Sequence, residues 1–300
     1  VLTMTIKVMI RVLGLYLRTR AIGRNFHTSN CSHVYEIKKS GYPIIHDRLP
    51  NTKNLSLLDR FRLGYKQLKE ECGLLTQEAR EHFNIHPPIL VAGEDDIVWK
   101  FDGTEQSLDK WVLTCDSDYN QGFSKQCFRL ELSPRGTGIF HGQLSCDVPN
   151  DGKTKRAGYC NITTVPKQKS FKRKDYYDWS QYNHLVLRVR GDGRCYMLNI
   201  LQRGYLDITW NDAYHYGLYT RGGPYWQTVK IPFSKFVFSG KGTVQDSQTP
   251  LSKMDITNFG ITLADNKPGP FKLEIDYVAV CLDEYHFEEF AYELNDVSQF

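Results

Sequence analysis

The 300-residue sequence lacks the features that mark a membrane-spanning protein or a common type of enzyme. No uninterrupted apolar run approaches the roughly 18 residues that a membrane-spanning helix needs. Gly-x-Ser-x-Gly, His-Glu-x-x-His and the phosphate-binding Gly-x-x-x-x-Gly-Lys-Ser/Thr motif are all missing, and no Gly-x-Gly-x-x-Gly opens a helix. We therefore expect a protein that is soluble or peripheral to a membrane, that is not an enzyme and that carries no cofactor.

The eight cysteines form neither a metal-binding nor a disulfide pattern. None are spaced as Cys-x-x-Cys, and no histidine lies at zinc-finger spacing from a cysteine pair. Seven remain without Cys31, which falls in the leader described below, and an odd number suits a disulfide framework poorly. Because several, such as Cys195 and Cys281, lie in strand-like runs, we expect reduced thiols in the core and no metal site.

Acidic residues are missing from the first 35 positions, which hold five cations: Lys7, Arg11, Arg18, Arg20 and Arg24. A basic, acid-free amphipathic segment is typical of mitochondrial transit peptides. We therefore predict a transit peptide over residues 1–33 and a location in the mitochondrial matrix or on the matrix side of the inner membrane. The alternatives are a signal anchor and an N-terminus without a targeting role. Beyond residue 35, 33 basic residues face 34 acidic ones, so the formal charge of +4 does not indicate nucleic-acid binding.

Residues 55–83 have the apolar periodicity of a helix. Apolar residues recur at steps of three and four at Leu58, Phe61, Tyr65, Leu68, Cys72 and Leu75. We assign residues 34–93 to a helical N-terminal arm with its linker, ended by Pro87-Pro88. An arm of this size holds no core of its own. The stripe of Leu58, Phe61, Tyr65 and Leu68 therefore packs on the main domain or binds a partner.

Residues 94–285 have the sequence pattern of strands separated by turns, and all five tryptophans lie in this range. Ten strands are predicted, and Gly191-Asp192-Gly193 predicts a tight hairpin turn. So many strands without intervening helices predict an all-β fold, a single β-sandwich of the jelly-roll type. The predicted strands are 97–101, 127–132, 138–144, 158–163, 184–190, 196–201, 208–214, 227–232, 258–263 and 271–280.

Four blocks in this region, in order, resemble the complex I intermediate-associated protein family of thirty kilodaltons. They are Trp99–Asp102, Asp178–Gly193, Trp226–Phe236 and Phe259–Asp276. The resemblance implies a galactose-binding-like jelly roll that acts as an assembly chaperone for respiratory complex I. It also implies partners: assembly intermediates and other assembly factors, among them an acyl-CoA dehydrogenase family member and a Toll-pathway signalling intermediate. The chain departs from the family pattern at Asp118–Ser124, where we expect a different loop shape.

Two further segments have alternative interpretations. Asn199, Trp210 and Tyr214 could form a glycan-type site, because aromatic rings and amides are the groups that carbohydrate modules use. The competing interpretation is that these residues only fill a sandwich. The basic loop Lys167–Lys174 either docks on an acidic partner or on anionic lipid, or is a solvated connection.

The C-terminal tail, residues 286–300, predicts an acidic amphipathic segment. Six acids lie within residues 283–300, and Phe287, Phe290, Leu294 and Val297 recur at helical spacing. This apolar stripe either folds onto the chain's own sandwich or binds a groove on a partner.

Overall fold

The computed structural model describes residues 57–83, 90–119, 121–124, 129–133, 136–150, 152, 154, 157–204, 212–240 and 242–292. The predicted transit peptide, the linkers flanking the helix, Trp210, Leu294 and Val297 lie outside these ranges. Among the described residues, no helix is both long and apolar enough to cross a bilayer.

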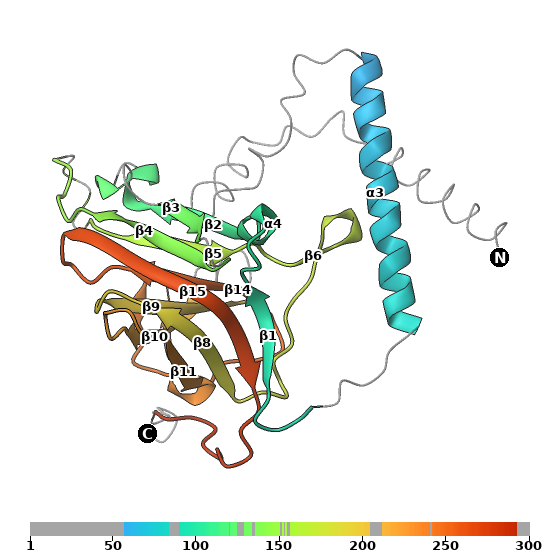
Figure 1. Cartoon of the computed structure of the whole chain (residues 1–300). Helices are drawn as coiled ribbons and strands as arrows, with labels where there is room; N and C mark the ends of the chain where they lie inside the picture. Colours follow the sequence, from blue (N-terminus) through green and yellow to red (C-terminus); the bar gives the residue numbers. More distant parts are fainter. Residues whose placement is uncertain are drawn as a thin grey trace, which may run out of the picture. The chain divides into compact units, whose positions relative to one another are not determined.

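Two antiparallel sheets carry most of the described chain (Figure 1). The first has the order β11-β8-β15-β4-β3, with β1 also paired to β15; the second has the order β13-β12-β10-β9-β14-β5-β2. The first sheet comprises β1 (Asp95–Lys100), β3 (Arg129–Leu132), β4 (Gly138–Leu144), β8 (His184–Arg190), β11 (Gln227–Pro232) and β15 (Gly269–Cys281). The second comprises β2 (Trp111–Cys115), β5 (Cys160–Thr164), β9 (Cys195–Gln202), β10 (Asp212–Tyr219), β12 (Val237–Gly240), β13 (Thr243–Val244) and β14 (Ile256–Leu263).

Helical and short elements complete the chain. The arm is the α-helix α3 (Leu57–Phe83), which continues through Gly73. A small hairpin is formed by β6 (Gln168–Lys169), the 3-10 turn η5 (Ser170–Lys172) and β7 (Arg173–Lys174). The remaining turns are α4 (Glu105–Leu108), η3 (Asp116–Tyr119) and η6 (Phe233–Lys235).

The core lies between the two sheets because each strand turns alternate residues inward. On β9, Tyr196, Leu198 and Ile200 are fully buried in the core, whereas Met197 faces away and is exposed. Aromatic rings fill one end of this core: Trp99 has its ring centroid 5.6 Å from that of Phe259, 6.0 Å from Trp179 and 6.2 Å from Trp111. Burying rings of this size is the main force holding the sheets together.

The predicted all-β fold, a jelly-roll β-sandwich with a helical N-terminal arm, is confirmed. The predicted strands 138–144, 184–190 and 227–232 match β4, β8 and β11 in both bounds. Three strands of the second sheet, β2, β12 and β13, were not predicted.

The hairpin predicted at Gly191-Asp192-Gly193 is wrong, because β8 and β9 belong to different sheets. The segment 191–194 instead connects the two sheets, and the Asp192 carboxylate stabilises it. This carboxylate accepts hydrogen bonds from the Arg194 and Lys272 N–H groups, at 3.1 and 2.8 Å, and from the Tyr196 hydroxyl at 3.2 Å. The connection is therefore bonded to β9 and to β15, one strand of each sheet.

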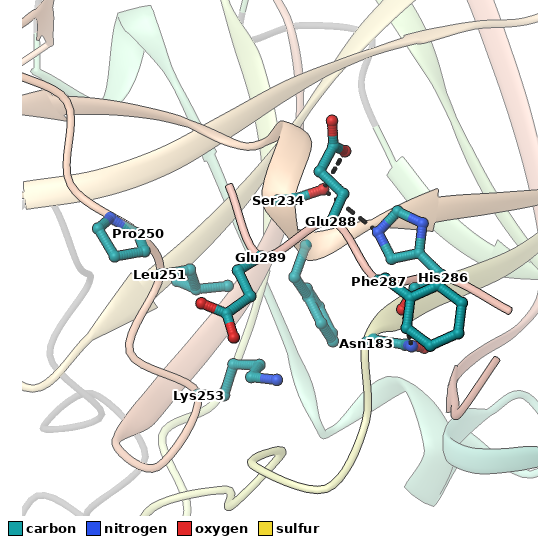
Figure 2. A pocket seen from close by; sticks show the side chains of 10 residues that line it. Asn183, Ser234, Pro250, Leu251, Lys253, His286, Phe287, Glu288 and Glu289 are labelled. Carbon is teal, nitrogen blue, oxygen red and sulfur yellow. Dashed lines mark hydrogen bonds between the residues drawn. The ribbon is translucent and has the colours of Figure 1, made fainter. Parts of the chain in front are cut away.

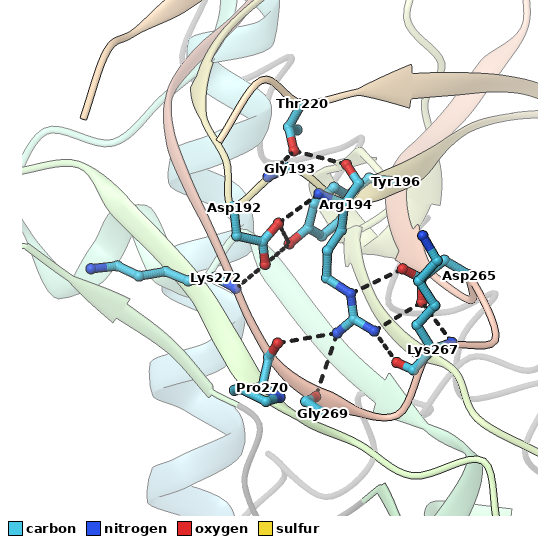
Figure 3. A network of polar contacts seen from close by, with 10 residues as sticks. All are labelled: Asp192, Gly193, Arg194, Tyr196, Thr220, Asp265, Lys267, Gly269, Pro270 and Lys272. Carbon is cyan, nitrogen blue, oxygen red and sulfur yellow. Dashed lines mark hydrogen bonds and ion pairs between the residues drawn. The ribbon is translucent and has the colours of Figure 1, made fainter. Parts of the chain in front are cut away.

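Beside this connection, the guanidinium group of Arg194, the residue that follows one family-like block, contacts residues of another, Phe259–Asp276 (Figure 3). Its Nε and Nη2 atoms donate to the two carboxylate oxygens of Asp265 at 2.9 and 3.0 Å, and both side chains are nearly buried. The other donors reach the carbonyl oxygens of Lys267, Gly269 and Pro270. One side chain thus fixes the loop between β14 and β15.

The loop in which we expected a departure from the family pattern lies around Asp116, which is fully buried. Its carboxylate accepts hydrogen bonds from the Ser124 N–H and hydroxyl, both at 3.1 Å, and from the Gly158 N–H at 2.8 Å. A Cβ atom at Gly122 would lie 2.0 Å from this carboxylate, so only glycine fits there.

Candidate functional site

The apolar stripe of α3 is open to solvent. Leu58, Phe61 and Tyr65 are 75%, 77% and 65% exposed, and Leu68 is 37% exposed. We call these four residues the arm stripe. Four large apolar residues in an unpartnered row on one helix side are uncommon on a protein surface that binds nothing.

A different side of the same helix is anchored to the hairpin through carboxylates. The Glu78 side chain accepts hydrogen bonds from the N–H and the hydroxyl of Ser170 and forms an ion pair with Arg173. Two helical turns earlier, Glu71 accepts a hydrogen bond of 2.6 Å from the Phe171 N–H. Glu71 and Glu78 are seven residues apart and therefore share one helix side.

The hairpin is shaped to present these N–H groups. Phe171 has a left-handed backbone with φ of 58°, which lets the successive N–H groups of Ser170 and Phe171 both point at carboxylates. The Ser170 N–H is the main cause that lowers the pKa of Glu78 below its ordinary value. Glu78 is therefore ionised at neutral pH and remains a hydrogen-bond acceptor.

The basic loop Lys167–Lys174 thus binds an acidic partner from its own chain. Arg173 contacts the arm, and Lys167 and Lys169 pair with Asp175 at 2.9 and 3.0 Å. These contacts occupy three of the loop's five cations and set the side by which the arm is held. The arm stripe is not on that side and stays exposed.

The described part of the C-terminal tail, through Tyr292, is not helical, so the helix expected there is wrong for these residues. Polar and backbone contacts hold it to η6: the Ala291 N–H donates to the Ser234 carbonyl at 3.1 Å, and the Tyr292 hydroxyl donates to the Lys235 carbonyl at 2.8 Å. Phe287 is 85% exposed and Phe290 is partly buried. In this part of the tail, a backbone hydrogen bond to η6 is found where the apolar spacing indicated a helix.

The tail forms one wall of a cavity of about 460 Å³ (Figure 2). Phe233 and Leu251 line it together with the tail residues His286–Glu289 and with Lys253, whose ammonium group donates to the Tyr182 carbonyl at 2.8 Å. Burial lowers the pKa of Lys253. Ser234 donates a hydrogen bond of 2.8 Å to Glu288. The Ser234 hydroxyl also lies 3.5 Å from Nε2 of His286, so serine, histidine and carboxylate side chains meet in the lining of this cavity.

Of the residues expected to form a glycan-type site, Trp210 lies outside the described residues, and Asn199 and Tyr214 do not meet. Tyr214 is buried in the core, where its hydroxyl donates to the Pro250 carbonyl at 3.1 Å. Asn199 lies on the opposite face of the same sheet, where its amide contacts Thr262 at 2.7 Å and His215 at 2.7 Å. Strand register explains this, because Tyr214 pairs with Ile200 while His215 pairs with Asn199.

Within the described ranges, no cluster of three or more His, Cys, Asp or Glu side chains could hold a metal ion. The six described cysteines are free thiols: Cys72, Cys115, Cys146, Cys160, Cys195 and Cys281.

Comparison with known proteins adds independent information about relatives. The sequence model of the family described as complex I intermediate-associated protein 30 matches residues 99–275. A mitochondrial protein of that name from Drosophila melanogaster is 48% identical over 281 residues, which is 91% of each chain. The Mus musculus protein of the same name is 46% identical over 201 residues, 67% of this chain and 60% of the relative.

Among solved structures, the family 11 carbohydrate-binding module of a Clostridium thermocellum cellulase is similar over 65% of this chain and 100% of that one. The identity is 16% and the TM-score 0.45.

Proposed function

Because the chain belongs to the complex I intermediate-associated protein 30 family, we propose that it is a mitochondrial assembly factor without enzymatic activity. It binds assembly intermediates of complex I, together with other assembly factors, in the matrix or on the matrix side of the inner membrane. The names of its relatives, which include both "mitochondrial" and "complex I intermediate-associated", support this proposal. The resemblance suggests an acyl-CoA dehydrogenase family member and a Toll-pathway signalling intermediate as the other factors.

One observation supports the proposed mechanism: Glu71 and Glu78 anchor the arm, while the arm stripe on another side of the helix is left exposed by the part of the chain that the structure describes. Leu58, Phe61, Tyr65 and Leu68 have the spacing with which an amphipathic helix enters an apolar groove. Exposed aromatic anchors of this kind dominate the energy of protein interfaces.

A protein partner is favoured over a lipid surface by the charge of the helix. The sequence of α3 contains five Lys or Arg and five Asp or Glu. A helix that lies on anionic lipid is typically rich in cations on its polar face. The balanced charge of α3 instead suits an apolar groove on an incompletely assembled subunit, which the stripe would cover until the permanent neighbour arrives.

The test is affinity purification of the chain from detergent-solubilised mitochondria, followed by quantification of co-purified complex I subunits. Phe61→Ala combined with Tyr65→Ala removes two anchors of the arm stripe. We expect at least a tenfold loss of captured intermediate, because each interfacial aromatic residue commonly contributes more than 1 kcal/mol. The melting temperature stays unchanged because both rings are exposed.

The matched control is Leu74→Ala. Leu74 is half exposed and lies nine residues, or two and a half turns, beyond Tyr65, on the opposite side of the helix. We expect Leu74→Ala to co-purify as much complex I intermediate as the unmodified chain. An undiminished amount with the double variant would refute the role of the arm stripe. A loss with Leu74→Ala alone would show that the partner binds the side of the helix that carries Leu74.

A further inference from the structure

Two cysteines face each other across the outermost pair of strands of the second sheet. Antiparallel pairing of β2 with β5 places Cys115 directly opposite Cys160. Both side chains point into the core and are essentially inaccessible, with 1% and 0% of their surface exposed. Their spacing does not predict the pair, since the two cysteines lie 45 positions apart.

The hydrogen-bond pattern shows which type of cross-strand pair they form. The Asp116 N–H donates to the Tyr159 carbonyl at 3.3 Å, and the Val165 N–H donates to the Lys110 carbonyl at 2.8 Å. Hydrogen-bonded and non-hydrogen-bonded pairs alternate along an antiparallel ladder. Counting from either of these bonds, the Cys115–Cys160 pair falls at a non-hydrogen-bonded position.

At such positions, the Cα atoms of opposed residues are about 4.5 Å apart and their side chains are closest. That separation lies within the range of about 4.4–6.8 Å over which disulfides bridge two Cα atoms. From this geometry we propose that Cys115 and Cys160 are an oxidation site, at which a disulfide closes and staples the edge strand β2 to β5.

The chemistry of the site explains why both cysteines stay reduced until an oxidant reaches them. Burial raises the pKa of Cys160 to about 12 and is also the main cause that raises the pKa of Cys115. Both sulfurs are therefore thiols at neutral pH and react slowly. Access depends on opening of β2, which is the last strand of its sheet and, among the described strands, pairs with β5 alone.

A disulfide oxidant such as oxidised glutathione accepts the two electrons that the two thiols lose. When β2 opens, the Cys115 thiol loses its proton to solvent, and the thiolate attacks one glutathione sulfur. One glutathione thiolate leaves, and a mixed disulfide remains on Cys115. Cys160 then loses its proton to solvent and attacks the Cys115 sulfur, which releases the second glutathione. Two protein thiols lose two electrons and two protons, and the oxidant gains them as two thiols.

The experiment incubates the full chain with oxidised glutathione at pH 8.5, with and without a concentration of urea below the unfolding transition. Tryptic digestion without reductant then separates the two cysteines into peptides 111–125 and 157–167, each with a single cysteine. We expect these two peptides to be joined, with a mass lower than their sum by two hydrogen atoms. Closing a loop of this length should raise the melting temperature by roughly 5 °C, and dithiothreitol should reverse the rise.

Variants separate this pair from the other thiols. Cys115→Ser abolishes the linked peptides and the thermal response, whereas Cys281→Ser, which alters an equally buried thiol on another strand, preserves both. Cys72→Ser, in the arm, also preserves both. Failure to find the linked peptides in either urea condition would overturn the proposal, as would linkage of Cys160 to any other cysteine.

Discussion

Replacing Arg194 with methionine tests whether one guanidinium holds the loop between β14 and β15. Methionine keeps most of the side-chain length but removes the charge and every donor. The Asp265 carboxylate then loses its bidentate partner while only 8% of its side chain is exposed. Breaking a buried ion pair by removing one partner costs about 3–5 kcal/mol, a fifth or more of the stability of a typical domain.

Two further variants identify the origin of that cost. Arg194→Lys keeps the charge but cannot form the two parallel hydrogen bonds to Asp265, so we expect a smaller loss of about 1–2 kcal/mol. Combining Arg194→Met with Asp265→Asn removes the uncompensated charge. The double variant should therefore lose less stability than the sum of the single variants, by about 1.5 kcal/mol or more.

The assay is urea denaturation followed by tryptophan fluorescence, because Trp99, Trp111 and Trp179 are buried in the core between the sheets. A loss below 1 kcal/mol for Arg194→Met would refute the assignment, because it would mean that the carboxylate finds water or another cation. Strict additivity in the double variant would also refute it.

Three further sets of variants test contacts in the arm, in the tail and at His184. Glu78→Gln should release the arm, seen as faster hydrogen exchange across α3 without a change in the melting of the sandwich, whereas Glu70→Gln, an exposed site on the same helix, should change neither. Because the folded-state pKa of Glu78 is lowered, the arm contact is complete at neutral pH and is lost as the pH falls through that value. In the tail, Phe287→Ala should leave the melting temperature unchanged because the ring is exposed, whereas Tyr292→Phe removes a hydrogen bond and should cost about 1 kcal/mol. Burial, followed by the neighbouring His286 and by Lys230 and Lys235, lowers the pKa of His184, and Asp283 only partly opposes this shift. The contribution of His184 to stability is therefore complete above about pH 6.5 and falls as the pH drops towards the folded-state value. His184→Gln should reduce the difference in unfolding free energy between pH 7.5 and pH 5.5.

The sequence predicted those parts of the fold in which local pattern and structure agree. The helix over 55–83 needed only its apolar periodicity, and the strand 184–190 is an apolar run bounded by turn residues. The strand Trp111–Cys115 was missed because it has five residues and no alternation: Thr114 and Cys115, adjacent in sequence, are both buried. Burial on both faces of a strand depends on what covers the sheet, which a short window of sequence does not contain.

The candidate site depended on contacts between distant residues. The carboxylates of Glu71 and Glu78 and the cations of the loop 167–174 were visible in the sequence. Nothing in their spacing indicated that they pair across roughly a hundred residues. The glycan-type grouping failed for a related reason: Asn199 and Tyr214 lie on paired strands, but the register places them on opposite faces. The arm stripe needed no long-range information and was found from periodicity alone.

Photocrosslinking from the arm inside mitochondria tests the central proposal most directly. A benzophenone amino acid replaces Tyr65, on the arm stripe, or Leu74, on the opposite side of α3, and the crosslinked proteins are identified after irradiation. We expect adducts with subunits of complex I intermediates from position 65 and far fewer from position 74. Crosslinks from position 65 only to the chain's own sandwich would contradict it, because the arm stripe would then be an internal packing surface.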